Sequence, residues 1–366
     1  FIADSQFTPA GDQVVNATQQ QWVTRNSDLN GWSNGVWNQV FCGDPGAPAS
    51  AFGVAKDNQY TTLGTCPVTE EEPFLYTGSN GTDSVFVPAV QHNSSGPTWT
   101  SGTEAGTSIP LSKFFVASPG TSASAMTAAM ARGLNLILTP GVYNLNQPIV
   151  VPHPDTVVLG LGMATLVPQN GNAAMMVVSN SGVKLSGLII DAGPVNSPVL
   201  LSVGTPGPGN ANDPDLIQDV FFRIGGAETT PVSATVSLLD NASNSIIDNL
   251  WAWRADHGNA VGWTVNTADT GVAVTGNNVT AYGLAVEHYQ KNEVIWSGQG
   301  GTDIFFQNEL PYDPPSQAAW MASPTQDGYP AFLVTNNVKS FQGYGMGSYV
   351  VFIQTTATLF DKEAFQ

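Results

Sequence analysis

Short runs of β-branched and aromatic residues, separated by Gly- and Asn-rich turns, fill most of this chain from about residue 134 onward. A helical pattern, with apolar residues three and four positions apart, is confined to residues 122–132, and Gly133 follows it as a stop signal. Comparable hydrophobic positions recur about every 26 to 33 residues, at Leu188, Phe221, Leu250, Val279, Phe305 and Val338. Strands that repeat at this interval without intervening helices predict the stacked coils of a parallel β-helix.

A β-sandwich is the alternative all-β architecture. Sandwiches favour hairpin turns about every 8 to 12 residues. The period here is longer, and the motifs DNLW, NNVTAYG and NNVKSFQG recur with it, which favours the β-helix. The Asn residues of these motifs are expected to supply left-handed corners or a stacked ladder of side chains rather than catalysis.

The pattern divides the chain into three parts. Residues 1–65 contain strand-like runs with many amide side chains and are predicted to be the end of an N-terminal β-helix domain. Residues 66–115 are predicted to be a linker, and the stretch 92–108 within it is expected to be an exposed connector. Residues 116–366 are predicted to form the C-terminal parallel β-helix, interrupted by a long loop at 204–215.

The charge balance limits the possible ligands. The 366 residues include 28 acidic and 10 basic side chains, which give a formal net charge of −18. Nucleic acid is excluded as an expected partner because its phosphates need clustered Lys and Arg. A polymeric ligand is expected to be neutral, since the same field repels polyanions. No apolar run approaches the length of a membrane span, so no membrane partner is expected.

Several features predict a secreted, extracellular glycoprotein. The chain starts at Phe1 without Met or a signal-peptide pattern, so a preceding segment is expected to have been removed. Acceptor sequons for N-glycosylation occur at Asn16, Asn80, Asn93, Asn241 and Asn278. Cys42 and Cys66 have no further Cys or His cluster around them, so a disulfide is favoured over a metal site.

The densest group of side chains suited to carbohydrate chemistry spans residues 251–312. Carboxyl groups cleave glycosidic bonds and aromatic faces stack on sugar rings. Glu287 and Glu309 are about one coil apart, which predicts that their carboxyl groups lie side by side with pKa values pushed apart. The alternative is that each Glu is a solvated edge residue. Trp251 and Trp253 alternate by two and so share a face, either of the core or of a groove.

No other catalytic or cofactor motif accompanies these residues. His92, His153, His257 and His288 are scattered without the spacing of metal ligands. The sequence contains no GxSxG elbow and no phosphate-binding loop, and GLGMA at residues 160–164 is expected to be a turn. No metal or other cofactor is therefore expected.

Segments along nearly the whole chain resemble those of glycoside hydrolase family 55. They are SNGVWNQVF, LILTPGVYNL, PDTVVLGLGMATLVP, DAGPVNSPVLL, WRADHG, GWTVNTADTG, EHYQKNEVIW, FFQNELPYDPP and GYGMGSY. The resemblance implies a secreted exo-β-1,3-glucanase, of the laminarinase type, that inverts the anomeric carbon. It also implies two right-handed, pectin-lyase-like β-helix domains lying side by side, with the substrate cleft between them.

The same resemblance implies roles for individual residues. Glu309 in QNELPY matches the general acid, and Glu287 in VEHYQ matches a second acid that polarises the attacking water or relays its proton. Ser5 in IADS matches a proton-relay serine. The aromatic residues implied at the terminal sugar subsite are Trp253 and Tyr312, joined by Trp251 or Tyr289.

The sequence departs from the family pattern at its start. In the family, the amide residue that holds the nucleophilic water comes from the first β-helix, and most of that domain is absent here. A missing N-terminal fragment of the same protein is therefore an expected partner. Two other functions stay open at this point: a non-catalytic β-glucan-binding or cell-wall protein, and a polysaccharide lyase, which the shortage of basic residues disfavours.

Overall fold

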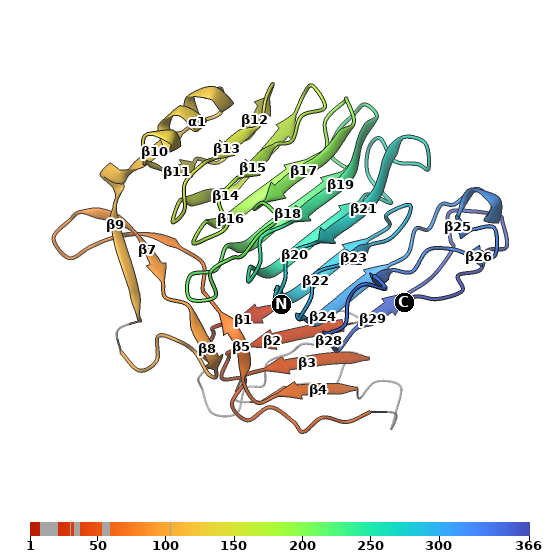
Figure 1. Ribbon diagram of the computed structural model, residues 1–366, viewed down its shortest axis with the longest axis horizontal. Helices are drawn as coiled ribbons and strands as arrows, with labels where there is room; N and C mark the ends of the chain where they lie inside the picture. The colour runs from red at the N-terminus through yellow and green to blue at the C-terminus, as the bar shows by residue number, and fades with distance from the viewer. Residues whose placement is uncertain (8–20, 30, 33–36, 53–58, 103) are drawn as a thin grey trace.

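Two parallel sheets stack coil upon coil and enclose a common core (Figure 1). The computed structural model describes residues 1–7, 21–29, 31–32, 37–52, 59–102 and 104–366. The eleven-stranded sheet contains β10 (Phe114–Ala117), β11 (Asn135–Leu138), β12 (Val142–Leu145), β14 (Val157–Pro168), β16 (Lys184–Asp191), β18 (Leu216–Ile224), β20 (Ile246–Arg254), β22 (Thr280–Glu287), β24 (Gly301–Glu309), β28 (Phe341–Tyr344) and β29 (Gly347–Tyr349). The seven-stranded sheet contains β13 (Ile149–Val151), β15 (Met175–Val177), β17 (Ser197–Val203), β19 (Val232–Asp240), β21 (Asn266–Val274), β23 (Val294–Trp296) and β27 (Phe332–Val334). The prediction of a parallel β-helix is confirmed.

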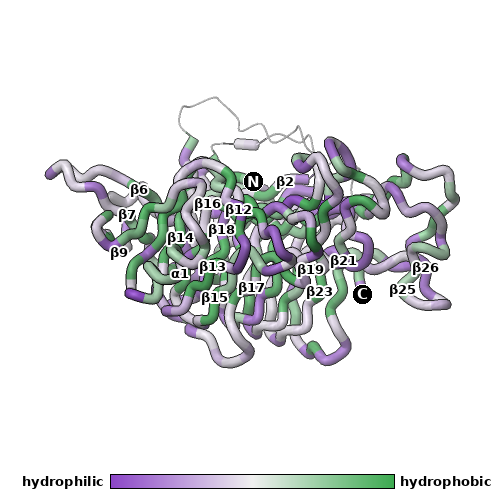
Figure 2. Tube along the Cα trace, turned by 90° about the horizontal axis from the view of Figure 1, so that it is seen from above, coloured by the Kyte–Doolittle hydropathy of each residue, from purple (hydrophilic) through white to green (hydrophobic). Residues whose placement is uncertain are grey.

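Alternate residues of each strand point into the space between the sheets and are apolar, because a single coil cannot bury its own inner face. Figure 2 shows the hydrophobic segments gathered in the strands and the hydrophilic ones in the connecting loops. One inner column contains Leu188, Val220, Leu250, Leu284 and Phe306. The expected positions Phe221 and Phe305 are each one residue away from this column, and Val279 and Val338 precede their strands. Loops of unequal length made the true register unreadable from spacing.

A left-handed residue bends each central strand of the eleven-stranded sheet near its middle. The bends occur at Gly187, Asp219, Asn249, Gly283 and Phe305, one on each successive coil. Asn tolerates this conformation better than most residues, which confirms the corner role predicted for Asn in DNLW. In the NNVTAYG turn, Asn278 is also left-handed, and its amide donates to Asn244 Oδ1 of the preceding coil at 3.3 Å.

The predicted helix is α1 (Ala123–Ala131), at the first coil of the β-helix. The Ser122 hydroxyl accepts from the Ala125 N–H at 3.2 Å, which caps the helix start. Gly133, with a φ of 83°, ends it. Met126 and Met130 are fully buried and join the core, so α1 covers the apolar end of the stack. None of the helices described is long and apolar enough to cross a membrane.

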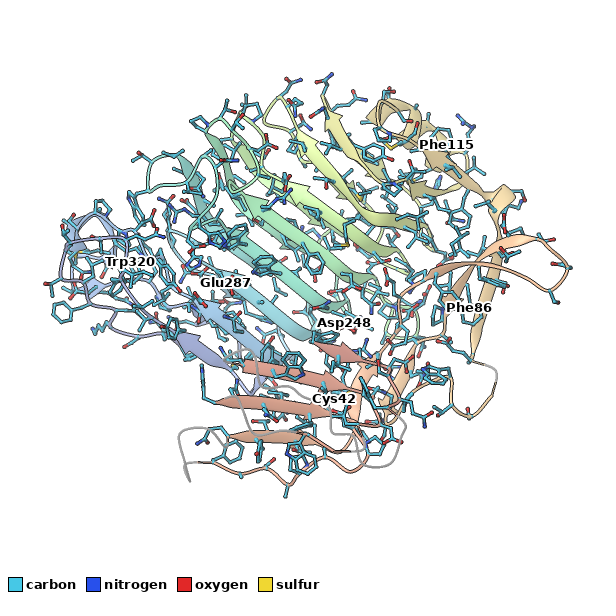
Figure 3. The ribbon with its side chains drawn as sticks, turned by 180° about the vertical axis from the view of Figure 1, so that it is seen from behind. Cys42, Phe86, Phe115, Asp248, Glu287 and Trp320 are labelled. Atoms are coloured by element: carbon cyan, nitrogen blue, oxygen red, sulfur yellow. A yellow bond between two sulfur atoms is a disulfide. The ribbon has the colours of Figure 1, made fainter. Side chains whose placement is uncertain are left out.

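The N-terminal residues form a separate parallel sheet of four strands: β1 (Ile2–Ala3), β2 (Gln21–Arg25), β3 (Asn38–Cys42) and β4 (Tyr60–Leu63). This sheet packs against the first halves of β18 to β24, where Val23 and Val40 contact Ile246, Tyr282 and Ile304. Arg25 crosses the contact and pairs with Asp248 at 2.6 Å, with both side chains fully buried. Figure 3 shows Asp248 beside β1. The predicted Cys42–Cys66 disulfide is present.

Residues 66–115, the expected linker, contain antiparallel strands. One sheet pairs β5 (Cys66–Thr69) with β8 (Gln91–Ser94), and another contains β6 (Phe74–Thr77), β7 (Asp83–Pro88) and β9 (Gly106–Pro110). The connector expected at 92–108 therefore carries parts of β8 and β9. The remaining short elements are η1 (Leu111–Lys113), η2 (Gln317–Ala319), β25 (Met321–Ser323) and β26 (Gln326–Asp327). The division of the chain at residues 65 and 115 stays a prediction.

An acid inside the core predicts a pH-dependent stability. Asp303 on β24 is fully buried, and burial raises its pKa well above the ordinary value. The folded chain therefore keeps Asp303 protonated where the unfolded chain ionises it, so its contribution to stability falls as pH rises above about 4. Asp303→Asn cannot ionise. The unfolding free energy of the variant relative to the parent should grow by up to about 1.4 kcal/mol for each pH unit.

Urea unfolding between about pH 4 and pH 7 measures this difference. Asp83→Asn is the matched control, because Asp83 on β7 is exposed. A difference between Asp303→Asn and the parent that stays constant across this range would contradict the prediction.

Candidate active site

The candidate site lies at the ends of three neighbouring strands in the eleven-stranded sheet. The pairing register places Trp253 on β20 opposite Glu287 on β22, and Glu287 opposite Glu309 on β24. Paired residues on neighbouring parallel strands project to the same side of a sheet. The predicted side-by-side placement of the two Glu residues is therefore present.

A cavity of about 310 Å³ lies over these strands. Its β-helix wall includes Asn249, Trp251, Glu287, Gln307 and Glu309. The facing wall comes from the N-terminal sheet and consists of Phe1, Gln21, Trp22 and Val23. Figure 3 shows Glu287 on the same sheet as Asp248, where the N-terminal sheet is docked. The cavity is thus formed between segments more than 200 residues apart in the sequence.

Glu287 lies in an environment that perturbs its pKa. Burial raises the pKa of Glu287 to about 7, and the neighbouring Glu309 charge adds to the increase. The Trp251 Nε1–H donates to Glu287 Oε2 at 2.8 Å and opposes it. Glu287 therefore holds a proton in mildly acidic solution, where an ordinary Glu is ionised.

Glu309 is held from the opposite side. The hydroxyl of Tyr312, in the loop that follows β24, donates to Glu309 Oε2. His288 lies behind this pair, with its ring in edge contact with Tyr312 and its Nε2 3.9 Å from Glu309 Oε2. The other ring nitrogen, Nδ1, lies 3.1 Å from Leu310 O. Burial lowers the pKa of His288, so the ring is neutral near pH 7.

Two tryptophans form an aromatic platform beside the carboxyl groups. The rings of Trp251 and Trp253 are stacked, with centroids 5.3 Å apart and an interplanar angle of 19°. Trp251 is 40% exposed and lines the cavity, whereas Trp253 is half-buried and is not among the residues that line it. Trp253 Nε1–H also donates to Asp256 Oδ1 at 3.2 Å. An exposed aromatic face next to two carboxyl groups suits a sugar ring, whose C–H surfaces pack on aromatics.

Four residues assigned from the resemblance are absent from the lining of this cavity: Ser5, Trp253, Tyr289 and Tyr312. The Tyr289 side chain is fully buried, and its hydroxyl shares a hydrogen bond with Ser237 Oγ at 2.6 Å in the core. Tyr289 therefore cannot stack on a substrate, because its ring has no free face. Ser5 is not among the residues that line the cavity, and its hydroxyl donates to Ala3 O at 2.7 Å. The relay role of Ser5 stays a prediction.

Several site residues were missed by the sequence analysis. Gln307 and Asn249 precede Glu309 and Trp251 by two positions, and strand alternation could have placed them on the same wall. Phe1 and Trp22 reach the cavity from another sheet, for which the sequence holds no local signal. The loop 204–215, which interrupts the coils, is absent from the lining of this cavity, and its residues Asn212 and Asp213 line a different one.

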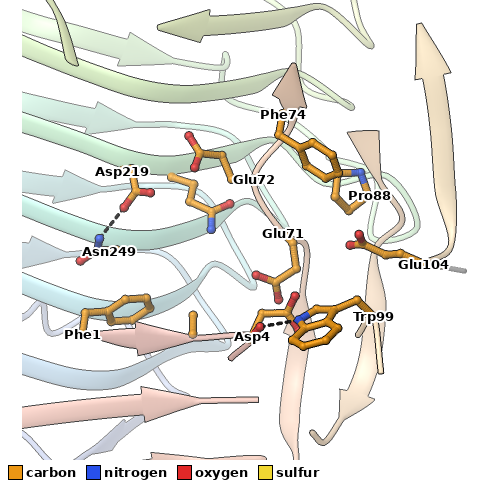
Figure 4. A pocket seen from close by; sticks show the side chains of 12 residues that line it. Phe1, Asp4, Glu71, Glu72, Phe74, Pro88, Trp99, Glu104, Asp219 and Asn249 are labelled. Carbon is orange, nitrogen blue, oxygen red and sulfur yellow. Dashed lines mark hydrogen bonds between the residues drawn. The ribbon is translucent and has the colours of Figure 1, made fainter. Parts of the chain in front are cut away.

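A second cavity, of about 540 Å³, adjoins the first through Phe1 and Asn249 (Figure 4). It is lined by the carboxyl groups of Asp4, Glu71, Glu72, Glu104 and Asp219. Each of these already accepts a hydrogen bond from a protein donor: Thr98 for Asp4 and Glu104, Arg25 for Glu71, Ser186 for Glu72 and Asn249 for Asp219. None of the described aromatic rings that line this cavity belongs to a stacked pair, whereas Trp251 in the first cavity does, so we place the chemistry in the first.

The other predicted sites are distributed over the surface. Asn80, Asn93 and Asn278 are exposed and Asn241 is half-buried, while Asn16 lies outside the described residues. Glycosylation at these sequons stays a prediction. Within the described ranges, no group of three or more His, Cys, Asp or Glu side chains is arranged to hold a metal ion.

Comparisons with known proteins bear on this geometry. A family model described as the LAM55 pectate lyase-like domain matches residues 114–309, just over half of the chain. An exo-beta-1,3-glucanase from Streptomyces sp. (strain SirexAA-E / ActE) is 49% identical over 355 residues, which cover 96% of this chain and 57% of that protein.

Two solved structures resemble this chain in fold and in sequence. The structure of sacteLam55A from Streptomyces sp. SirexAA-E matches with a TM-score of 0.92 and 46% identity, covering 100% of this chain and 64% of that one. A variant of sacteLam55A in complex with glucose matches with a TM-score of 0.91 and 48% identity, covering 96% of this chain and 62% of that one.

The chain therefore spans less than two thirds of the length of these relatives. The residues that the family model matches run from the start of β10 to Glu309. They therefore include β22 and β24, the two strands that carry the candidate carboxyl groups. The resemblance to glycoside hydrolase family 55 is confirmed by these matches. By its sequence, its coils and its match to that model, the chain belongs to the family of the LAM55 pectate lyase-like domain.

Proposed function

We propose that the chain hydrolyses β-1,3-glucan from a chain end, releases glucose and inverts the anomeric carbon, with Glu309 as general acid. The observation that carries this proposal is the placement of Glu287 and Glu309 on adjacent coils beside the stacked Trp251 and Trp253. The name of the Streptomyces relative, an exo-beta-1,3-glucanase, and the glucose complex of the sacteLam55A variant support it.

In this mechanism Glu309 protonates the departing glycosidic oxygen, while Glu287 polarises the attacking water or relays its proton. The hydrogen bonds of the two carboxyl groups favour the wide spacing that inversion needs. Trp251 holds Glu287 towards β20, whereas Tyr312 holds Glu309 towards the loop after β24. Inverting enzymes keep their carboxyl groups about 6.5 to 9.5 Å apart to leave room for water. The resemblance assigns the residue that holds the water to the first β-helix domain of such proteins.

The composition of the cavity supports hydrolysis over elimination. A lyase acting on a uronate needs a cation to neutralise the substrate carboxylate, and no Lys or Arg is among the described residues that line the cavity. The acidic walls suit a neutral glucan. Trp251 supplies stacking surface, and Gln307 and Asn249 supply amide groups for hydroxyls.

Proton NMR of a β-1,3-glucan digest tests the proposal. The anomeric signals in the first minutes, before mutarotation, are expected to show α-glucose. If β-glucose appears first, the reaction retains the anomeric configuration, so inversion is wrong while glucan hydrolysis still holds. A digest without released sugar, together with retained glucan binding, would replace hydrolysis by a β-glucan-binding role.

A further inference from the structure

Arg254, the last residue of β20, lies directly behind the candidate active site and is 1% exposed. Its guanidinium donates four hydrogen bonds. Nε donates to Asn266 O at 2.8 Å, and Nη1 donates to His288 O at 3.1 Å. Nη1 and Nη2 bind the two carboxylate oxygens of Asp313, each at 2.9 Å. The face of the guanidinium lies 5.5 Å from the centroid of the Trp263 ring.

These bonds connect the backbone of three successive coils at the position where the candidate carboxyl groups leave the sheet. His288 directly follows Glu287, so the bond to His288 O fixes the end of β22. Asp313 follows Tyr312, whose hydroxyl donates to Glu309. Arg254 thus holds one end of the Glu287 strand and the loop that orients Glu309.

We propose that the Arg254–Asp313 ion pair is a positioning device that sets the relative placement of the Glu287 and Glu309 carboxyl groups. The proposal rests on the proposed function, because it assigns these groups to the reaction. The planar fork of Arg binds a carboxylate at two points, which fixes orientation as well as distance. Since buried ion pairs contribute little net stability compared with apolar packing, placement is the stronger reason for burying one here.

The chain contains a matched ion pair that serves as a control. Arg223 on β18 binds Asp191 on β16 at two points, with distances of 2.8 and 2.7 Å. Asp191 is 3% exposed and lies in the same cross-strand row as Glu287 and Glu309. This pair connects coils that precede the two carboxyl-bearing strands, so its loss removes a similar interaction without releasing Glu287 or Glu309.

The test compares Asp313→Asn with Asp191→Asn in kinetics on a short β-1,3-glucan. Asp313→Asn keeps the shape of the side chain but removes the charge and the two-point contact. A displacement of about 1 Å in catalytic groups can cost about 10²-fold in rate. We expect kcat to fall about 10- to 100-fold with KM within about threefold of the parent. Asp191→Asn should keep kcat within about twofold.

Thermal unfolding separates placement from loss of fold. If Asp313→Asn has the parent kcat at temperatures well below its own melting temperature, the ion pair stabilises the fold only and the proposal is overturned. Equal kcat values for Asp313→Asn and the parent would also overturn it. Asp313→Glu, which restores the charge on a longer side chain, should recover part of kcat.

A second readout does not depend on turnover. Trp251 donates a hydrogen bond to Glu287, so its fluorescence should change when Glu287 ionises. The contribution of Trp251 is the part of the fluorescence that is lost in Trp251→Phe. This part should titrate with the pKa of Glu287, which is about 7. Glu309 and Asp256 are the other acidic groups that act on this pKa. Asp313→Asn should lower the midpoint of this fluorescence titration, and Asp191→Asn should leave the midpoint unchanged. If the midpoint is unchanged in both variants, the proposal is overturned. If the parent releases no sugar, the proposed function fails, and this midpoint still decides the positioning role.

Discussion

Glu309→Gln should reduce the release of glucose from β-1,3-glucan by about 10³-fold, within the usual range of about 10²- to 10⁴-fold for general acid catalysis. The amide has the shape of the carboxyl group but no proton to give to the leaving oxygen. It can still accept a hydrogen bond from Tyr312, so the site should keep its geometry and its affinity. The measurement is kcat on the polymer together with calorimetric binding of a short β-1,3-glucan.

A substrate whose leaving group needs no proton makes this test specific. The dinitrophenolate group of a dinitrophenyl glucoside departs as a stable anion, so Glu309→Gln should retain most of the parent activity on this substrate. Loss of the attacking water or of the fold would instead remove activity on both substrates. Glu363→Gln, at an exposed position near the C-terminus, is the control. Polymer hydrolysis by Glu309→Gln at the parent rate would show that another group supplies the proton.

The β-helix could be predicted because its signal is local and repeated. Each central coil contributes a strand with alternating apolar residues and a left-handed bend, at Gly, Asn, Asp or Phe, so the architecture was readable although the exact register was not. Within the site, the adjacency of Glu287 and Glu309 was also readable, since they lie about one coil apart on neighbouring strands. Tyr289, which the resemblance assigned to the sugar subsite, is instead buried in the core, because two residues past the strand end the alternation of faces no longer holds.

The remaining parts of the site depend on contacts that no local pattern encodes. Phe1 and Trp22 form the opposite wall only because the N-terminal sheet docks on the first halves of β18 to β24. Arg254 and Asp313 come together through loops of unequal length. The raised pKa of Glu287 depends on burial between these elements, which follows from docking rather than from the residues next to it in sequence.

The docking of the N-terminal sheet depends on Arg25, so we expect removal of this side chain to destabilise the fold strongly. Arg25 is fully buried and pairs with Asp248 at 2.6 Å and with Glu71 at 2.5 Å. Its guanidinium also lies 5.9 Å and 5.8 Å from the ring centroids of Phe1 and Tyr282. Arg25→Met keeps much of the apolar stem but leaves two buried carboxyl groups without their cation. Removing one partner of a buried pair costs about 3 to 5 kcal/mol, so the unfolding free energy should fall by about this amount.

The loss should depend on pH in a direction that identifies its cause. Burial already raises the pKa of Asp248 to about 7 while Arg25 holds it down. Without Arg25 this pKa rises further, so Asp248 stays protonated in the folded chain and ionises on unfolding. The destabilisation by Arg25→Met should therefore increase as pH rises above about 7, measured by urea unfolding between about pH 5 and pH 9. Lys291→Met removes one partner of the Lys291–Asp269 pair, which is exposed on both sides, and should cost about 1 kcal/mol or less at each pH. If both variants lost the same stability, or if the Arg25→Met loss were independent of pH, the N-terminal sheet would be held by its apolar contacts and not by this ion pair.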